Sequence, residues 1–580
     1  MRLITFLLLI LTIVNYGQIE NKWLTKFEKS VYKATFSYDE TMEYFGKLAD
    51  HSENADMIEF GISPQGRKLY CFIAASNNEF TPEKAKKSGK PIIFINNGIH
   101  SGEIEGKDAC ALLLRQILIT KEKKEYLDDV ILMVIPIHNV DGHERKSKYN
   151  RINQNGPEEM GWRTTAQNLN LNRDFLKADA LEMQSWLKLF GEWLPDLLID
   201  VHTTNGANYQ YTITYSMETY KNIPDKTAKW VKNEFLPIIT KETEDAGYLT
   251  APYLWFRDGI IDGFTGWVAG PRFSNGYAAA QNRPGLLIET HMLKSYKDRV
   301  YGTKAMLESV IKYYNTNANE IVLMNKEADE FVVSKYALRK EYFPIKFANT
   351  KKFENFKFKG FKSISEYSMI SGSEVVKYTD KKCEVDIPFY NDFFVKDSVK
   401  LPDAYLIPSE WSDLVRVLKY HGVEVEILDS DEEFEVEEYK FNDVKFSTLP
   451  YEGRFQPGFK FEIDNKKAVL PKGTFRVKTA QRNLPVIAHL LEPIADDSFV
   501  RWGFMNQIFE RKEYFEMYSM EPIANEMFQS DEALREEFLR KIDSDEKFKN
   551  DPRARINFFY EKSEYYDKKH NVYPVLRQIK

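Results

Sequence analysis

The first residues of this chain whose types and spacing suit metal binding are His100 and Glu103. They lie three positions apart in the segment INNGIHSGEIEGKDA, which directly follows an apolar run. An imidazole nitrogen and a carboxylate oxygen are both zinc ligands. The spacing alone identifies nothing, because four of the nine histidines have an acidic residue three positions later. The surrounding sequence must decide among them.

The position of His100 relative to the predicted strands distinguishes it from the other three histidines. It follows the apolar run PIIFIN (91–96) by four residues, in a loop that contains glycine and precedes a helical pattern. Ligands of open α/β sheets bind just beyond the carboxyl ends of strands. His202 ends a second apolar run, DLLIDVH (196–202). A hydrolytic zinc site takes three protein ligands and leaves a position for water, so His202 is the candidate third ligand.

A zinc hydrolase also needs a general base that does not itself bind the metal. Glu289 stands near the end of a third apolar run, GLLIET (285–290). Burial at such a position would raise the pKa of a carboxyl toward values at which it exchanges protons near neutral pH. A structural salt bridge is the alternative role for this carboxylate.

The elements that must position these residues lie between about 55 and 300. Short runs rich in Ile, Leu and Val alternate there with stretches of helical apolar spacing. Such continuous apolar runs are typical of strands buried on both faces. The alternation predicts an α/β fold with a mixed central sheet flanked by helices. In the helix expected after His100, we assign Glu105 and Asp108 to the first turn, where the helix dipole favours negative charge.

The rest of the chain has a different composition. Aromatic and β-branched residues dominate from 340 to about 480, which predicts a β-rich region, and charged helical spacing begins near 494. The predicted organisation is a signal peptide (1–17), an α/β domain that carries the candidate site (18–320), a β-rich accessory region (340–490) and a helical C-terminal segment (491–580).

The N-terminal sequence MRLITFLLLILTIVNYGQ has the order of a signal peptide. Arg2 precedes an apolar stretch of 12 residues, from Leu3 to Val14, and Gly17 offers a small residue for cleavage. A membrane span takes about 20 residues, so this stretch is short for one. The sequence therefore predicts a secreted or periplasmic protein with no membrane span after signal removal; an uncleaved anchor is the alternative.

The overall composition excludes several classes of protein. A hydrophobic content of 43% and an aromatic content of 14% indicate a globular chain. The net charge of -7, without a long basic run, gives no basis for nucleic-acid binding. Three cysteines cannot build a disulfide framework or a thiolate zinc site. The chain has no serine-hydrolase elbow, phosphate-binding loop or dinucleotide fingerprint.

Seven segments, taken in order, make the sequence familiar: GISPQGRKL, NNGIHSGEIEGKDA, HNVDG, RINQNG, NLNLNRDF, IDVH and LIETH. Together they resemble the zinc carboxypeptidases of the carboxypeptidase A/B type, over roughly residues 35–315. The resemblance implies a carboxypeptidase-like fold and one Zn²⁺ per chain. It also implies zinc ligation by His100, Glu103 and His202, with Glu289 as the general base that acts on zinc-activated water.

The resemblance implies a substrate-binding group as well. Asn172 and Arg173, in LNLNRDF, match the pair that holds the terminal carboxylate of the substrate, a task that suits the planar and permanently charged guanidinium. The family's acidic residue two positions before that Asn is replaced here by Asn170. Tyr277 is the candidate for the tyrosine that closes over the substrate from a mobile loop.

Two arginines compete for the role of stabilising the oxyanion beside the metal. Arg151, in RINQNG, matches the Arg-x-Asn pattern of the family and is the one we prefer. Arg163, in GWRTT, is the alternative and lies nearer to the carboxylate-binding pair.

The leading hypothesis is a secreted or periplasmic zinc carboxypeptidase that acts on the C-terminus of a peptide or protein. A second hypothesis keeps the zinc chemistry but makes the chain an amidase or peptidase that acts on cell-wall peptides or acylated amino acids. A third is a non-catalytic binding protein with a hydrolase-like domain. Cleavage of free-carboxylate peptides, but not of their C-terminal amides, would distinguish the first from the other two.

Overall fold

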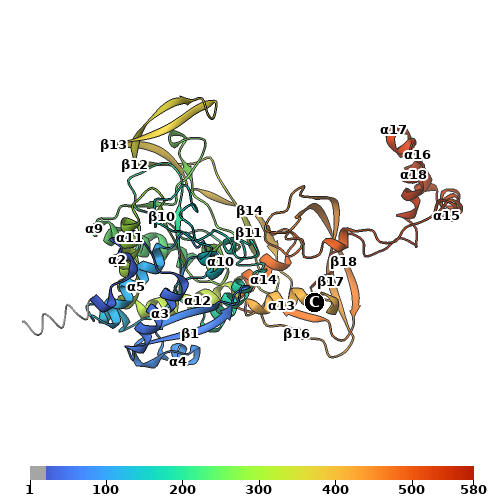
Figure 1. Cartoon of the computed structure of the whole chain (residues 1–580). Coiled ribbons are helices and arrows are strands. Elements are labelled where there is room, and N and C mark those ends of the chain that lie inside the picture. Colours follow the sequence, from blue (N-terminus) through green and yellow to red (C-terminus); the bar gives the residue numbers. More distant parts are fainter. Residues whose placement is uncertain (1–20, 580) are drawn as a thin grey trace, which may run out of the picture.

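The computed structural model describes residues 21–579 (Figure 1). The predicted signal peptide (1–17) therefore lies outside the described residues. Within the described part of the chain, no helix combines the length and the apolar character needed to cross a membrane.

An eight-stranded mixed sheet forms the centre of the N-terminal half. Its order is β1-β2-β4-β3-β5-β10-β6-β7. Strands β4, β3, β5 and β10 run parallel to one another, and β1 and β2 pair antiparallel with their neighbours. Strand β6 pairs antiparallel with β10 and parallel with β7. The bounds are β1 (Ala55–Ile62), β2 (Lys68–Ala74), β3 (Ile92–Asn97), β4 (Ile131–Ile135), β5 (Leu197–Thr204), β6 (Ile213–Ser216), β7 (Thr250–Pro252) and β10 (Gly285–His291).

Helices cover both faces of this sheet. Successive side chains of each strand point to opposite faces, so the buried strands present apolar side chains to the helices on both sides. Phe94 of β3 packs in one apolar cluster with Trp186, whereas Ile93 and Ile95 pack in another. The helices of this half are α2 (Lys26–Lys29), α3 (Tyr38–Asp50), α4 (Pro82–Ser88), α5 (Glu105–Leu118), α6 (Val140–Glu144), α7 (Leu181–Trp193), α8 (Asp225–Trp230), α9 (Leu236–Asp245), α10 (Ser274–Ala280), α11 (Tyr296–Thr316) and α12 (Ala318–Tyr336).

A second, six-stranded sheet of order β16-β19-β15-β20-β17-β18 follows in the chain. Tyr405 and Leu418 of this region belong to the same apolar cluster as Trp186, so the two halves share a core. The elements here are β15 (Ala404–Ile407), α13 (Ser412–Tyr420), β16 (Glu426–Ile427), β17 (Glu432–Phe446), β18 (Pro457–Leu470), β19 (Phe475–Lys478), α14 (Leu484–Leu491) and β20 (Leu576–Gln578).

Two smaller sheets complete the β-rich region. They are formed by β11 (Tyr342–Asn349) with β14 (Phe393–Lys400), and by β12 (Glu354–Ser368) and β13 (Ser373–Tyr390) with the short strands β8 (Trp255–Phe256) and β9 (Phe264–Thr265). The β12–β13 hairpin projects from the body of the molecule (Figure 1).

Four C-terminal helices lie apart from both sheets at the right of Figure 1. They are α15 (Met517–Ser530), α16 (Glu532–Ser544), α17 (Glu546–Lys549) and α18 (Pro552–Tyr560), and they surround an apolar cluster of their own. The chain then returns to the second sheet, where the backbone N–H of Asn571 donates to the carbonyl of Ile508 at 3.0 Å. The predicted fold class is confirmed, whereas the domain boundaries stay a prediction.

Candidate active site

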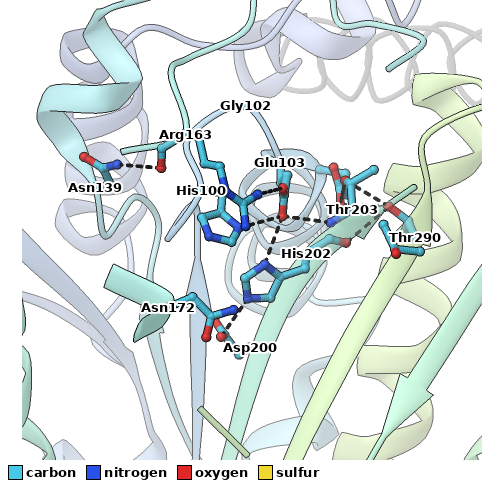
Figure 2. Close-up of polar contacts among 12 residues, drawn as sticks. His100, Gly102, Glu103, Asn139, Arg163, Asn172, Asp200, His202, Thr203 and Thr290 are labelled. Carbon is cyan, nitrogen blue, oxygen red and sulfur yellow. Dashed lines mark hydrogen bonds and ion pairs between the residues drawn. The ribbon is translucent and has the colours of Figure 1, made fainter. Parts of the chain in front are cut away.

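The two histidines and the glutamate proposed as ligands come together at the carboxyl ends of β3 and β5. His100 follows β3, Glu103 precedes α5, and His202 lies within β5 (Figure 2). Oε2 of Glu103 is 3.2 Å from Nδ1 of His100 and 2.9 Å from Nδ1 of His202. The three side chains are at most 3% exposed. Within residues 21–579, they are the one cluster of such groups that could hold a metal ion.

The second nitrogen of each imidazole has a partner that fixes the tautomer. Nε2 of His100 donates to Oδ1 of Asn170 at 2.9 Å, and the same oxygen accepts the backbone N–H of Asn172, which identifies it as the amide carbonyl. Nε2 of His202 donates to the carboxylate of Asp200 at 2.8 Å. Both Nδ1 lone pairs are therefore directed toward Glu103, as metal ligation requires.

The spacing of these donor atoms fits zinc. Ligands at the usual zinc bond lengths in a tetrahedral arrangement stand about 3.3 Å from one another. The separations of 3.2 and 2.9 Å between Glu103 and the two imidazoles are close to that value. Two imidazoles and one carboxylate form a hydrolytic ligand set that leaves a fourth position for water or substrate.

Burial and neighbouring charges have different effects on the three groups. Burial alone would raise the pKa of Glu103, but Arg151 and His100 outweigh it and hold the pKa well below its usual range. Burial lowers the pKa of His100 to about 4. Burial also opposes the charged form of His202, but the carboxylate of Asp200 outweighs it and raises the pKa well above its usual range.

Glu289 lies beside His202, because the two residues are register partners on the parallel strands β10 and β5. It lines the same cavity of about 270 Å³ as the three ligand candidates. Its side chain is nearly buried, and burial raises its pKa to about 8, against the opposing effect of His202. A carboxyl with this pKa can exchange a proton near neutral pH.

A hydrogen-bonded group behind the cavity was not predicted as part of the site. The carboxylate of Glu105, at the start of α5, accepts from the hydroxyls of Thr203 and Thr290 at 2.5 and 2.8 Å. These threonines directly follow His202 and Glu289, and they are register partners too. Glu105 therefore ties together the three elements that carry the ligands and the base. The position of Glu105 two residues after Glu103 was the available signal in the sequence. We had instead explained its negative charge by its place in the first turn of the helix.

Asn172 and Arg173 also line the cavity, in a short 3₁₀ turn after Asn170. The guanidinium of Arg173 lies over the ring of Phe273, 4.5 Å from its centroid. Its Nη1 donates to the carbonyl of Asn172 at 2.6 Å, and its Nε donates to the hydroxyl of Tyr451 at 3.1 Å. A residue of the β-rich region thus reaches the edge of the site.

The two competing arginines occupy different positions. Arg163 lines the cavity, with a side chain that is 43% exposed, and its Nη1 is 3.3 Å from Glu103. Arg151 is 10% exposed, pairs with the same oxygen of Glu103, Oε1, at 2.5 Å, and is not among the lining residues. It packs tightly over Gly102, where a Cβ would come within 2.7 Å of Arg151 Cγ. Arg163, our second choice from the sequence, is therefore the arginine that faces the cavity.

Tyr277 does not face the cavity, and our expectation of a mobile tyrosine at this position is wrong. The segment forms helix α10 instead of a loop, because its small residues pack between neighbouring elements. Tyr277 is fully buried, and its hydroxyl accepts from Gln281 at 2.8 Å and contacts Nδ1 of His421 at 3.1 Å. The tyrosine that lines the cavity is Tyr253, whose hydroxyl accepts from Thr204 at 3.3 Å.

Comparison with known proteins agrees with this geometry. Residues 41–188 match the family model described as zinc carboxypeptidase. The chain is 22% identical over 508 residues to carboxypeptidase 2 of Trichophyton rubrum, which covers 80% of this chain and 84% of the relative. It is 22% identical over 499 residues to probable carboxypeptidase 2 of Arthroderma benhamiae, with 78% and 83% covered.

Solved structures of the same class were also found. A metallo-carboxypeptidase from Burkholderia cenocepacia has a TM-score of 0.37 and 16% identity, with 49% of this chain and 70% of that chain covered. Carboxypeptidase A from Helicoverpa armigera has a TM-score of 0.36 and 15% identity, with 48% and 74% covered. By its family match over residues 41–188 and its relatives, the chain is similar to the zinc carboxypeptidases, and these matches support a zinc metallocarboxypeptidase, a hydrolase. The resemblance inferred from the motifs is confirmed.

Proposed function

We propose that this protein is a secreted or periplasmic zinc carboxypeptidase that hydrolyses the C-terminal peptide bond of its substrate. The observation that carries the proposal is the shared cavity of about 270 Å³, which the metal-ligand candidates, Glu289 and Arg173 line together. The apolar N-terminal sequence supports export. A peptide or protein C-terminus is the substrate that this combination favours.

His100, Glu103 and His202 would hold one zinc ion. The convergent Nδ1 atoms and the carboxylate support this assignment, as do the partners Asn170 and Asp200, which accept from each Nε2 and so leave each Nδ1 directed at the metal position. When bound, zinc supplies Lewis-acid chemistry that activates water and polarises the scissile carbonyl.

Glu289 would act as general base and then as general acid. Its carboxylate accepts a proton from the attacking water as the oxygen forms its bond to the carbonyl carbon. It returns that proton to the amine nitrogen as the C–N bond breaks, which yields a shortened peptide and a free amino acid. The raised pKa of Glu289, about 8 in the metal-free chain because of burial, supports both transfers.

Arg163 would stabilise the negative charge that develops on the carbonyl oxygen, because its guanidinium lines the cavity beside Glu103. Asn172 and Arg173 would bind the terminal carboxylate of the substrate in the cavity. We call these two residues the carboxylate clamp. The clamp is what favours a carboxypeptidase over a zinc amidase, which needs no cation at this position.

The test is hydrolysis of matched peptides that end in a free carboxylate or in an amide. We expect stoichiometric zinc and hydrolysis of the free acids at a much higher rate than that of the amides, which should show only slow residual cleavage. We expect Glu289→Gln to keep the zinc and to lower kcat by about 10²–10⁴-fold, the range for loss of a general base. Equal cleavage of acids and amides would overturn the clamp and favour the amidase hypothesis, whereas zinc binding without any hydrolysis would favour a binding protein.

A further inference from the structure

A tight turn of the β-rich region lies against the carboxylate clamp. It joins β17 to β18 and consists of residues 451–454, with Glu452 and Gly453 at positive φ values of 49° and 76°. The N–H and C=O groups of Tyr451 and Arg454 pair across it at 2.9 and 3.1 Å. Positive φ at both central residues is typical of a type I′ hairpin turn, which holds its side chains in a defined geometry.

The turn contacts both ends of the segment that carries the clamp. The hydroxyl of Tyr451 accepts from Nε of Arg173 at 3.1 Å. The carboxylate of Glu452 accepts the backbone N–H of Asn170 at 2.9 Å. Asn170 in turn holds the imidazole of His100 and the N–H of Asn172. One turn of the second sheet therefore supports the four residues from Asn170 to Arg173.

The turn is itself fixed to both halves of the molecule. Arg454 binds the two carboxylate oxygens of Asp179 at 2.8 and 2.6 Å, in the two-point geometry that gives guanidinium–carboxylate pairs their directionality. The ring of Tyr451 stacks on Trp502, with centroids 5.9 Å apart and an interplanar angle of 11°. The Tyr451 hydroxyl is thus presented to Arg173 by a ring that is stacked on Trp502.

We propose that the Tyr451–Arg454 turn is a positioning element of the clamp, and that Tyr451 orients Arg173 for the terminal carboxylate of a peptide. This role rests on the proposed carboxypeptidase function. Arg173 has a long side chain and stands at the edge of the cavity, so an unsupported guanidinium would lose conformational entropy when it binds substrate. The hydroxyl of Tyr451 and the ring of Phe273 restrict that motion in advance.

The experiment compares Tyr451→Phe with wild type, both loaded with zinc, on the free-acid peptide and its amide. Loss of one hydrogen bond to the guanidinium is expected to raise KM for the free acid by about threefold to tenfold. We expect kcat to stay within about twofold, because a positioning contact made equally in ground and transition states affects binding alone. The slow residual hydrolysis of the amide should not change.

Tyr420→Phe is the matched control, because its hydroxyl also reaches from the β-rich region to the α/β half, where it donates to Gln184 at 3.2 Å, away from the clamp. It should leave KM unchanged. A KM for Tyr451→Phe equal to that of wild type, or an equal loss on acid and amide, overturns the positioning role.

Arg173→Met separates this proposal from the proposed function. If Arg173→Met abolishes the preference for free acids while Tyr451→Phe keeps the wild-type KM, only the positioning role is wrong. If Arg173→Met keeps the preference, the clamp is wrong and the role of Tyr451 fails with it.

Discussion

The candidate site, meaning the cavity lining and the residues that support it, has two halves that are built in different ways. The strand half consists of His202 and Thr203 on β5 with Glu289 and Thr290 on β10, which face each other in register on adjacent parallel strands. The loop half comprises His100, Arg163, Asn170, Asn172 and Arg173, which lie in connecting segments. Backbone pairing positions the strand half, whereas individual side-chain contacts position the loop half.

The supports of the loop half come from distant parts of the sequence. Asn170 and Arg173 are contacted by Glu452 and Tyr451, 282 and 278 positions away. In the strand half, Asp200 supports a histidine only two positions away. The comparison teaches that the metal and the base depend mainly on the α/β sheet, while substrate recognition depends on the second sheet as well.

The two halves also differ in charge. The histidine of the strand half is paired with a carboxylate, Asp200, and the histidine of the loop half with a neutral amide, Asn170. A charged partner raises the basicity of a ligating imidazole more than a neutral one does. The strand half should therefore contribute more to zinc affinity.

The largest effect we expect tests whether the loop half takes part in catalysis. Arg163→Ala should lower kcat by about 10²–10³-fold, as loss of an oxyanion donor does, because this guanidinium lines the cavity. Arg151→Ala should lower kcat much less in zinc-loaded enzyme, because Arg151 contacts Glu103 from outside the cavity. Steady-state kinetics of both variants, each at a measured zinc occupancy, decide which arginine supports catalysis. A larger loss for Arg151→Ala would restore the assignment preferred from the sequence.

An exchange of the histidine partners tests the difference in charge. Asp200→Asn should weaken zinc binding by about 10- to 100-fold, because it removes the charge that supports His202. Asn170→Asp should strengthen binding, because it gives His100 the same kind of partner. Competition with a chelator of known affinity measures both. Equal affinities in wild type and Asp200→Asn would remove the distinction between the halves.

The smallest effect we expect concerns the number of protons that the protein releases when it binds zinc. In the metal-free chain at pH 7, Glu289 is mostly protonated, because its pKa of about 8 lies above that pH. His202 is protonated as well, whereas the pKa of His100 is about 4 and its ring is already neutral. Zinc binding favours the deprotonated forms, so protons should leave the strand half only.

Calorimetry of zinc binding in buffers of different ionisation enthalpy measures this release. Glu289→Gln should reduce it by about one proton at pH 7 and by much less at pH 9, where the wild-type carboxyl has already lost its proton. An unaltered count in Glu289→Gln would show that this carboxyl is ionised in the metal-free protein.

The accuracy of the sequence-based predictions follows the same division. The apolar runs at 196–202 and 285–290 became β5 and β10, and the position of each polar residue along its run put it beside the cavity. Tyr277 was misplaced because the resemblance implied a tyrosine in a mobile loop before the base strand, whereas tertiary packing makes this segment helix α10. The choice between Arg151 and Arg163 depended on which of the two side chains lines the cavity, and motif spacing does not contain that information.

The sequence by itself determined which residues are available for the proposed chemistry: two histidines and one glutamate at predicted strand ends, a carboxylate on a third strand, and an arginine after LNLN. These features are local, because strand formation and side-chain alternation depend on neighbouring residues. The tertiary structure alone decided which arginine and which tyrosine face the cavity, and that Tyr451 supports Arg173. Contacts between residues far apart in the chain depend on how the two sheets pack, which no short segment of the sequence specifies.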